Sequence, residues 1–197
     1  MIDLELFTEA DFAQLIGWLD HERLLTEWSG PLFSFPLTPD QLRGYLQHAN
    51  QPQRSERFAY KAVDADSGAA VGHISLDYLN WNDQTGRITR VLVGAPAARG
   101  HGVGQAMVKA ALRIGFEELG LRRISLGVYD FNATAIRCYQ RCGFRRIGTL
   151  QDVVRFHGEA WSSMEMSIMK HEWTPVEKPP PLLGRNARFG ASSALGS

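Results

Sequence analysis

A glycine-rich segment near the middle of the chain is the clearest place where residue types and spacing could do chemistry. A predicted strand ends at Val93, Arg99-Gly100-His101-Gly102-Val103-Gly104 follows, and a predicted helix begins at Gly102. Glycines let the backbone turn tightly and let a bulky anion approach backbone N–H groups. The helix start adds unpaired N–H donors and a positive dipole end, and Arg99 adds a full charge. The segment therefore predicts a site for a diphosphate-containing cofactor.

Other ligands, or none, could explain glycines in a loop. A glycine-rich turn without a ligand would show similar spacing. A dinucleotide fold places an acid near Asp130, but it requires G-x-G-x-x-G, and the chain reads G-H-G-V-G-Q. A P-loop requires a Lys-Ser/Thr pair that the segment lacks. A nucleotide-dependent oxidoreductase therefore stays a disfavoured alternative.

A second chemical candidate is Tyr139, in a predicted helix that Asn132 can cap. A phenol with a pKa of about 10 can donate its proton to a developing thiolate. The structural alternative is a core tyrosine on an amphipathic helix, with Asn132 as a cap that needs no ligand.

Periodicity and capping signals outline the elements that must position these residues. Strands are predicted at residues 2–6, 58–63, 70–79, 88–93, 124–129, 144–156 and 160–169. Helices are predicted at residues 9–20, 22–28, 38–46, 102–119 and 132–140. The alternation of strands and helices from residue 88 to 154 implies a parallel or mixed sheet with helical cover.

The composition is that of an ordinary globular domain, with 44% hydrophobic and 21% charged residues among 197. Lys+Arg and Asp+Glu balance at 21 each, so we expect no nucleic-acid partner. No apolar run or basic leader predicts a membrane span or a signal peptide, so we expect a cytoplasmic protein. Cys138 and Cys142 predict neither a disulfide framework nor a metal site. We expect a domain at residues 1–173 and a Pro/Gly/Ser-rich tail at 174–197.

The two motifs together resemble a known family. Arg99–Gly104 matches the R/Q-x-x-G-x-G/A signature of the GNAT family of N-acetyltransferases, and Asn132–Phe144 is similar to its N-x-x-A-x-x-x-Y-x-x-x-G-F stretch. The order of strands and helices is similar over residues 1–173. Trp28–Pro31 and Trp161–Trp173 resemble the ribosomal-protein and small-amine branch of that family.

The resemblance implies an α/β fold. Its sheet is mixed, mainly antiparallel, of about seven strands, and flanked by helices. It also implies a splay between the strands at 88–93 and 124–129, which admits acetyl-CoA. The pyrophosphate would lie at Arg99–Gly104, and the pantetheine amides would pair with backbone near Leu92 and Val93. The implied cofactor-binding residues are Leu92, Val93, Arg99, Gly100, His101, Gly102, Val103, Gly104, Asn132 and Tyr139.

The implied activity is direct transfer of an acetyl group from acetyl-CoA to a primary amine of a small molecule, protein or peptide, in a ternary complex. Tyr139 would be the general acid, and the backbone N–H of Val93 would stabilise the developing oxyanion. The alternative is a non-catalytic acyl-CoA-binding or interaction module on the same fold. We expect acetyl-CoA and an amine acceptor as partners and no membrane partner, and a homodimer is left open.

The acceptor side is less clearly marked. Four aromatic residues are expected to line it: Trp28, Phe33, Tyr78 and Trp81. Ordinary packing is the alternative for each. Four residues are candidates for the general base: Asp77, His73, Glu165 and His157. Ordered water is a fifth candidate.

Overall fold

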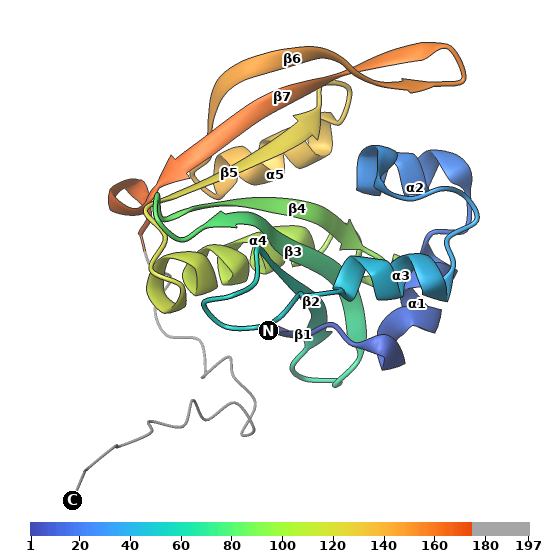
Figure 1. The fold of residues 1–197 in the computed structure, drawn as a ribbon, viewed down its shortest axis with the longest axis horizontal. Helices are drawn as coiled ribbons and strands as arrows, with labels where there is room; N and C mark the ends of the chain where they lie inside the picture. Colours follow the sequence, from blue (N-terminus) through green and yellow to red (C-terminus); the bar gives the residue numbers. More distant parts are fainter. Residues whose placement is uncertain (175–197) are drawn as a thin grey trace, which may run out of the picture.

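The computed structural model describes residues 1–174, so the predicted tail lies outside the described residues except for Thr174. A seven-stranded sheet in the order β1-β2-β3-β4-β5-β7-β6 forms the centre of the fold (Figure 1). The strands are β1 (Ile2–Leu6), β2 (Arg57–Asp64), β3 (Ala70–Asn80), β4 (Thr85–Val93), β5 (Arg123–Tyr129), β6 (Arg145–Phe156) and β7 (Glu159–Met169). Among the strands of residues 1–174, only β4 and β5 pair in parallel. The predicted mixed, mainly antiparallel sheet is confirmed.

Five α-helices and several shorter turns surround the sheet. The helices are α1 (Phe12–Trp18), α2 (Glu22–Ser29), α3 (Pro39–Leu46), α4 (Val103–Arg113) and α5 (Ala133–Arg141). In Figure 1, α1, α2 and α3 gather at one end of the sheet, and the far end of the β6–β7 hairpin reaches over α2. Within residues 1–174, no helix combines the length and apolar character needed to cross a membrane.

Two predicted helices are shorter than expected. The helix predicted at 9–20 begins as a 3₁₀ turn, Glu9–Asp11, because the Asp11 carboxylate accepts hydrogen bonds from the Thr8 N–H and hydroxyl. The helix predicted at 102–119 is α-helical only to Arg113 and continues as a π-helical turn over Ile114–Glu118. Both differences depend on local hydrogen bonding that apolar periodicity does not report.

The core is divided into two clusters. One lies between the sheet and α4, where Met107, Val108, Ala111 and Leu112 are fully buried. The other lies beneath α1, α2 and α3, and it includes Leu15 and Leu42. The first cluster holds the start of α4 against the end of β4, and the second holds α2 beside the sheet.

The splay between β4 and β5 has a visible cause. Parallel pairing is limited to Thr85–Arg87 of β4 and Arg123–Ser125 of β5. Beyond it, the register of β4 against β3 shifts between His73 and Ser75, and Arg90 has φ +52°. A bulge of this kind bends its strand. Beyond Arg87, β4 therefore leaves β5, and the predicted splay is confirmed.

Candidate active site

The glycine loop presents open backbone at the start of α4. Gly100 and Gly102 have φ of +81° and +77°, and a Cβ at either would meet no atom within 4 Å. Gly102 is also the N-cap residue of α4, and it supplies no side-chain cap. The first-turn N–H groups of α4 are therefore available to an anion. This geometry fits the pyrophosphate of acetyl-CoA.

Arg99 has a structural task that the sequence did not indicate. Its Nε donates to the Val93 carbonyl at 3.1 Å, and its Nη2 donates to the Gly94 carbonyl at 3.2 Å. The guanidinium thereby ties the loop to the end of β4. In the rest of the loop, His101 is exposed, and Val103 packs against the core.

A cavity of about 700 Å³ lies in the splay. Its floor is formed by residues 88–91 of β4 and 127–129 of β5. Asn132 and Tyr139 line one side, and residues 27–32 of α2 and the following turn line another. The cavity therefore extends from Tyr139, the predicted acid, to the turn after α2.

Tyr139 lies on α5 with 8% of its surface exposed, and it contacts the cavity. Burial raises the pKa of its phenol, so the hydroxyl is protonated at neutral pH. Within residues 1–174, the hydroxyl makes no hydrogen bond, so it is free to donate to a ligand. The Asn132 side chain accepts from the Ala135 N–H at 3.0 Å, which confirms its predicted place as a helix cap.

The aromatic residues predicted for the acceptor side divide into two groups. Trp28 and Tyr78 line the cavity. Phe33 does not line it but stacks on Trp28, with ring centroids 5.7 Å apart. Trp81 also lies away from the cavity, because it follows the end of β3 and its indole N–H donates to the Ser55 carbonyl at 3.2 Å. Trp81 is therefore a packing residue.

The four candidate bases are spread over different environments. His73 is buried, chiefly desolvation lowers its pKa to about 3, and it does not line the cavity. Asp77 is 1% exposed and lies behind the cavity wall. His157 is exposed at the hairpin turn, 3.0 Å from Glu22. Glu165 is the one member of this set that lines the cavity.

Sequence reasoning missed three arginines that line the cavity: Arg57, Arg87 and Arg90. Arg87 and Arg90 lie on β4, and Arg57 begins β2. The sequence did contain a signal for them. Strand β4 alternates buried and partly exposed residues and holds two arginines, and buried charges require partners, so a cluster of charged side chains could have been predicted there.

Outside the cavity lining, Arg23 of α2 contacts the β6–β7 hairpin and Phe131, which follows β5. The Arg23 guanidinium lies over the rings of Phe131, Phe156 and Trp161, at 5.9, 5.8 and 5.2 Å from their centroids. It also donates to Glu159 at 3.3 Å. These contacts hold α2 against the hairpin.

An opened pair of parallel strands, an open glycine loop at a helix start and a buried phenol between them define an acyl-CoA-dependent acyltransferase. The comparison with known families agrees. The acetyltransferase (GNAT) domain matches residues 2–145. The chain belongs to this family, and its activity is acetyl-CoA-dependent N-acetyl transfer.

Several characterised proteins are similar over most of the chain. Aminoglycoside N(6')-acetyltransferase type 1 of Klebsiella pneumoniae is 27% identical over 154 residues, 76% of each chain. Phosphinothricin N-acetyltransferase of Streptomyces coelicolor is 28% identical over 127 residues, 64% of this chain and 72% of the relative. The crystal structure of spermidine N-acetyltransferase from Vibrio cholerae with CoA and spermine has a TM-score of 0.74 at 21% identity, covering 87% of this chain and 96% of that one. This last likeness shows the shared fold.

Proposed function

We propose that the chain transfers acetyl groups from acetyl-CoA directly to a primary amine, with both substrates bound in the splay cavity. The observation that carries this proposal is the continuity of that cavity from Tyr139 to the turn after α2. A donor that enters beside α4 and an acceptor that enters beside α2 would meet at Tyr139. Within the described residues, the cavity lining includes no cysteine, and we therefore propose direct transfer rather than a cysteine-bound acyl intermediate.

The donor side is assigned to the glycine loop and β4. The residues from Arg99 to Gly104 would hold the pyrophosphate through backbone N–H groups and the α4 dipole. The backbone near Leu92 and Val93 would pair with the pantetheine amides, on the strand edge that β5 leaves open. The Val93 N–H would polarise the thioester carbonyl.

Proton movements are assigned to Tyr139 and water. Tyr139 would donate its proton to the departing thiolate, because burial keeps the phenol protonated and its hydroxyl faces the cavity. Glu165 already accepts two hydrogen bonds from Arg87 and one from Ser163. We therefore assign removal of the amine proton to water.

The acceptor would be a small molecule. Relatives are named for aminoglycosides and phosphinothricin, and a fold neighbour binds spermine, so the family alone does not identify one amine. A protein amino terminus, as in the ribosomal-protein branch, is the second candidate. We also propose a cytoplasmic location, in keeping with two unpaired cysteines.

The test is thiol release from acetyl-CoA across a panel of primary amines, with calorimetry using acetyl-CoA and NAD. We expect acetyl-CoA binding, no NAD binding, and thiol release with at least one amine. Acetyl-CoA binding without thiol release would favour a non-catalytic acyl-CoA-binding module. NAD binding without acetyl-CoA binding would overturn the proposal.

A further inference from the structure

The part of the splay cavity next to α2, where we propose that the acceptor binds, is called the acceptor compartment. It carries a specific charge pattern. Its lining includes Arg57, Arg87 and Arg90, together with two carboxylates, Glu27 and Glu165. Whether a cationic or an anionic acceptor fits depends on which of these charges are already paired.

Arg87 and Glu165 form a closed pair. Two guanidinium nitrogens of Arg87 donate to the two carboxylate oxygens, at 2.6 and 2.9 Å, and the Ser163 hydroxyl lies 3.0 Å from one of them. Such a two-point pair is strong and fixed in geometry. It contributes no net charge to the compartment.

Glu27 is also paired. Arg23 lies one helical turn earlier on α2, and its Nε donates to Glu27 at 3.0 Å. Arg23 also donates to Glu159 at 3.3 Å, which does not line the cavity, so one guanidinium serves two carboxylates. Within residues 1–174, each carboxylate of the cavity lining therefore has an arginine partner, and Glu27 shares its partner with Glu159.

Asp77 stands between the two remaining arginines. It accepts from Arg57 Nε at 2.5 Å and also from Arg90. Because one carboxylate faces two guanidinium groups, this cluster keeps one net positive charge. Arg90 and Asp77 are 6% and 1% exposed, whereas the Arg57 side chain is 26% exposed, so the surplus charge is accessible at Arg57.

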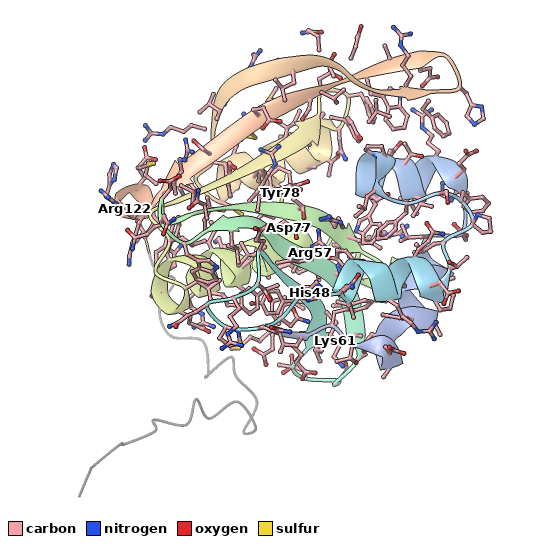
Figure 2. All side chains as sticks on the ribbon, in the orientation of Figure 1. His48, Arg57, Lys61, Asp77, Tyr78 and Arg122 are labelled. Carbon is pink, nitrogen blue, oxygen red and sulfur yellow. The ribbon has the colours of Figure 1, made fainter. Side chains whose placement is uncertain are left out.

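The Arg57 guanidinium is held in place with donors to spare. Its Nη1 donates to the Tyr45 carbonyl at 2.7 Å, and its guanidinium carbon lies 4.6 Å from the centroid of the Tyr45 ring. Within the described residues, its Nη2 forms no hydrogen bond. Figure 2 shows Arg57 and Asp77 close together in the middle of the molecule. Arg57 is therefore an oriented, partly exposed donor with an uncompensated charge.

A polyamine brings two or more ammonium groups and requires carboxylates to receive them. In the described residues, both carboxylates of this compartment already have an arginine partner, whereas the cluster of Arg57, Asp77 and Arg90 keeps one positive charge. Resting on the proposed function, we infer that the acceptor is a primary amine that also carries a carboxylate, and that Arg57 binds this carboxylate. Asp77 is the positioning residue that orients Arg57.

The test compares acceptors that differ in one group: 5-aminopentanoate, pentylamine and 1,5-diaminopentane. Amino acids from glycine to 6-aminohexanoate vary the distance between amine and carboxylate. We expect kcat/KM for the best amino acid to exceed that of its matched alkylamine and diamine by at least about 10-fold. Equal or higher kcat/KM with the alkylamine or the diamine would overturn the inference.

Variants locate the effect. Arg57→Gln should lower kcat/KM for the best amino acid by about 10- to 100-fold, mainly through KM, with little change for pentylamine. Arg57→Lys keeps the charge and should restore part of the loss. Arg122→Gln is the matched control, because Arg122 is exposed and lies at the edge of the molecule, away from Arg57 (Figure 2). An equal loss for pentylamine and the amino acid in Arg57→Gln would contradict the assignment.

Binding provides a readout that does not require turnover. Calorimetry of the protein–CoA complex should detect N-acetyl-5-aminopentanoate, or the product of the best amino acid, more strongly than N-acetylpentylamine. This preference should disappear in Arg57→Gln. Equal binding of both products would overturn the inference even when acetyl transfer is active. Absence of acetyl-CoA binding would instead overturn the proposed function, and this inference with it.

Discussion

Burial keeps two titratable side chains near the centre of the molecule neutral. Tyr139 is held as a neutral phenol beside the cavity, and His73 is held as a neutral imidazole beneath it. Tyr139 lines the cavity, whereas His73 contacts the Tyr45 hydroxyl at 3.2 Å and does not. Both groups are neutral, so their position separates them: Tyr139 can reach a ligand as the proposed acid, whereas His73 packs inside the core.

Replacing Tyr139 with Phe removes the proposed acid and keeps the ring. We expect kcat to fall by about 10²- to 10⁴-fold with little change in acetyl-CoA affinity, because the proton is needed only as the thiolate departs. Tyr60→Phe is the matched control, since Tyr60 is a buried tyrosine outside the cavity. Full activity in Tyr139→Phe with normal acetyl-CoA binding would refute the acid role.

His73 should make stability depend on pH. The pKa of His73 is 6.5 in the unfolded chain and about 3 in the folded chain. Below pH 6.5 the unfolded chain therefore binds a proton that the folded chain does not, and the unfolding free energy falls as the pH falls. Above pH 6.5 the contribution of His73 to this free energy is complete. The unfolding free energy then changes by up to about 1.4 kcal/mol per pH unit because of His73. His73→Gln should flatten the dependence of the unfolding free energy between pH 6.5 and 4.5, measured with urea.

The control for this experiment is His48→Asn, because His48 is exposed and Asn tolerates its φ of +60°. It should retain the wild-type slope. Identical slopes for wild type and His73→Gln would show that His73 does not carry the pH dependence.

Two elements create the site by their departures from regular structure. The bulge at Arg90 turns β4 away from β5, and left-handed glycines carry the chain into α4 without side chains over the exposed backbone. Arg87 is the last residue of β4 that pairs with β5. Its side chain passes over Gly127 of β5 and reaches Glu165 on β7. This ion pair joins the strands where they begin to separate.

Gly102→Ala tests the loop, with Gly68→Ala as its matched control. Both glycines have left-handed φ, +77° and +71°, and both are surrounded by open space. The two variants should therefore lose similar stability. We expect only Gly102→Ala to weaken acetyl-CoA binding, by about 10-fold or more, because its methyl group would cover the proposed phosphate site. Calorimetry measures the difference, and equal affinities in the two variants would argue against this site.

Gly127→Ala tests the close crossing of the ion pair. Its Cβ would lie 2.5 Å from Arg87 Nη2, 2.7 Å from Glu165 Oε1 and 2.7 Å from Ser163 Oγ. We expect a loss of about 1–3 kcal/mol in unfolding free energy, because these polar atoms must move apart. Gly148→Ala on β6 should stay within about 0.5 kcal/mol, since its Cβ would meet nothing within 4 Å. Urea unfolding that gives equal values for both variants would contradict this account.

At the scale of the whole molecule, two core clusters and the Arg23 contacts hold the donor and acceptor sides together. The larger cluster supports α4 and α5, and the other supports α1, α2 and α3. All these contacts lie within residues 1–174.

A chain ending at Thr174 should therefore fold cooperatively and bind acetyl-CoA as the full chain does. Its thermal midpoint should differ by no more than about 2 °C, because every core residue named above is retained. Calorimetry and thermal unfolding of both chains provide the comparison. Loss of the cooperative transition would show that residues 175–197 stabilise the domain.

The sequence by itself determined all seven strands in outline and the family, and it predicted the donor side of the site. This was achievable because Arg99–Gly104 and Asn132–Phe144 are contiguous motifs, in which turn conformation and helix capping depend on neighbouring residues. The π-helical turn after Arg113 and the 3₁₀ start before α1 were missed, because periodicity does not report hydrogen-bond register.

Only the tertiary structure decided which charged residues meet at the proposed acceptor side. Arg57, Asp77 and Arg90 come from β2, β3 and β4, and Glu165 reaches Arg87 from β7. Their partners depend on strand pairing, on the bulge at Arg90 and on the register of strands far apart in the chain. The same pairing placed Tyr78 on the cavity and Trp81 away from it, although three positions separate them. Charge neutralisation is a property of spatial neighbours, and the sequence lists only neighbours along the chain.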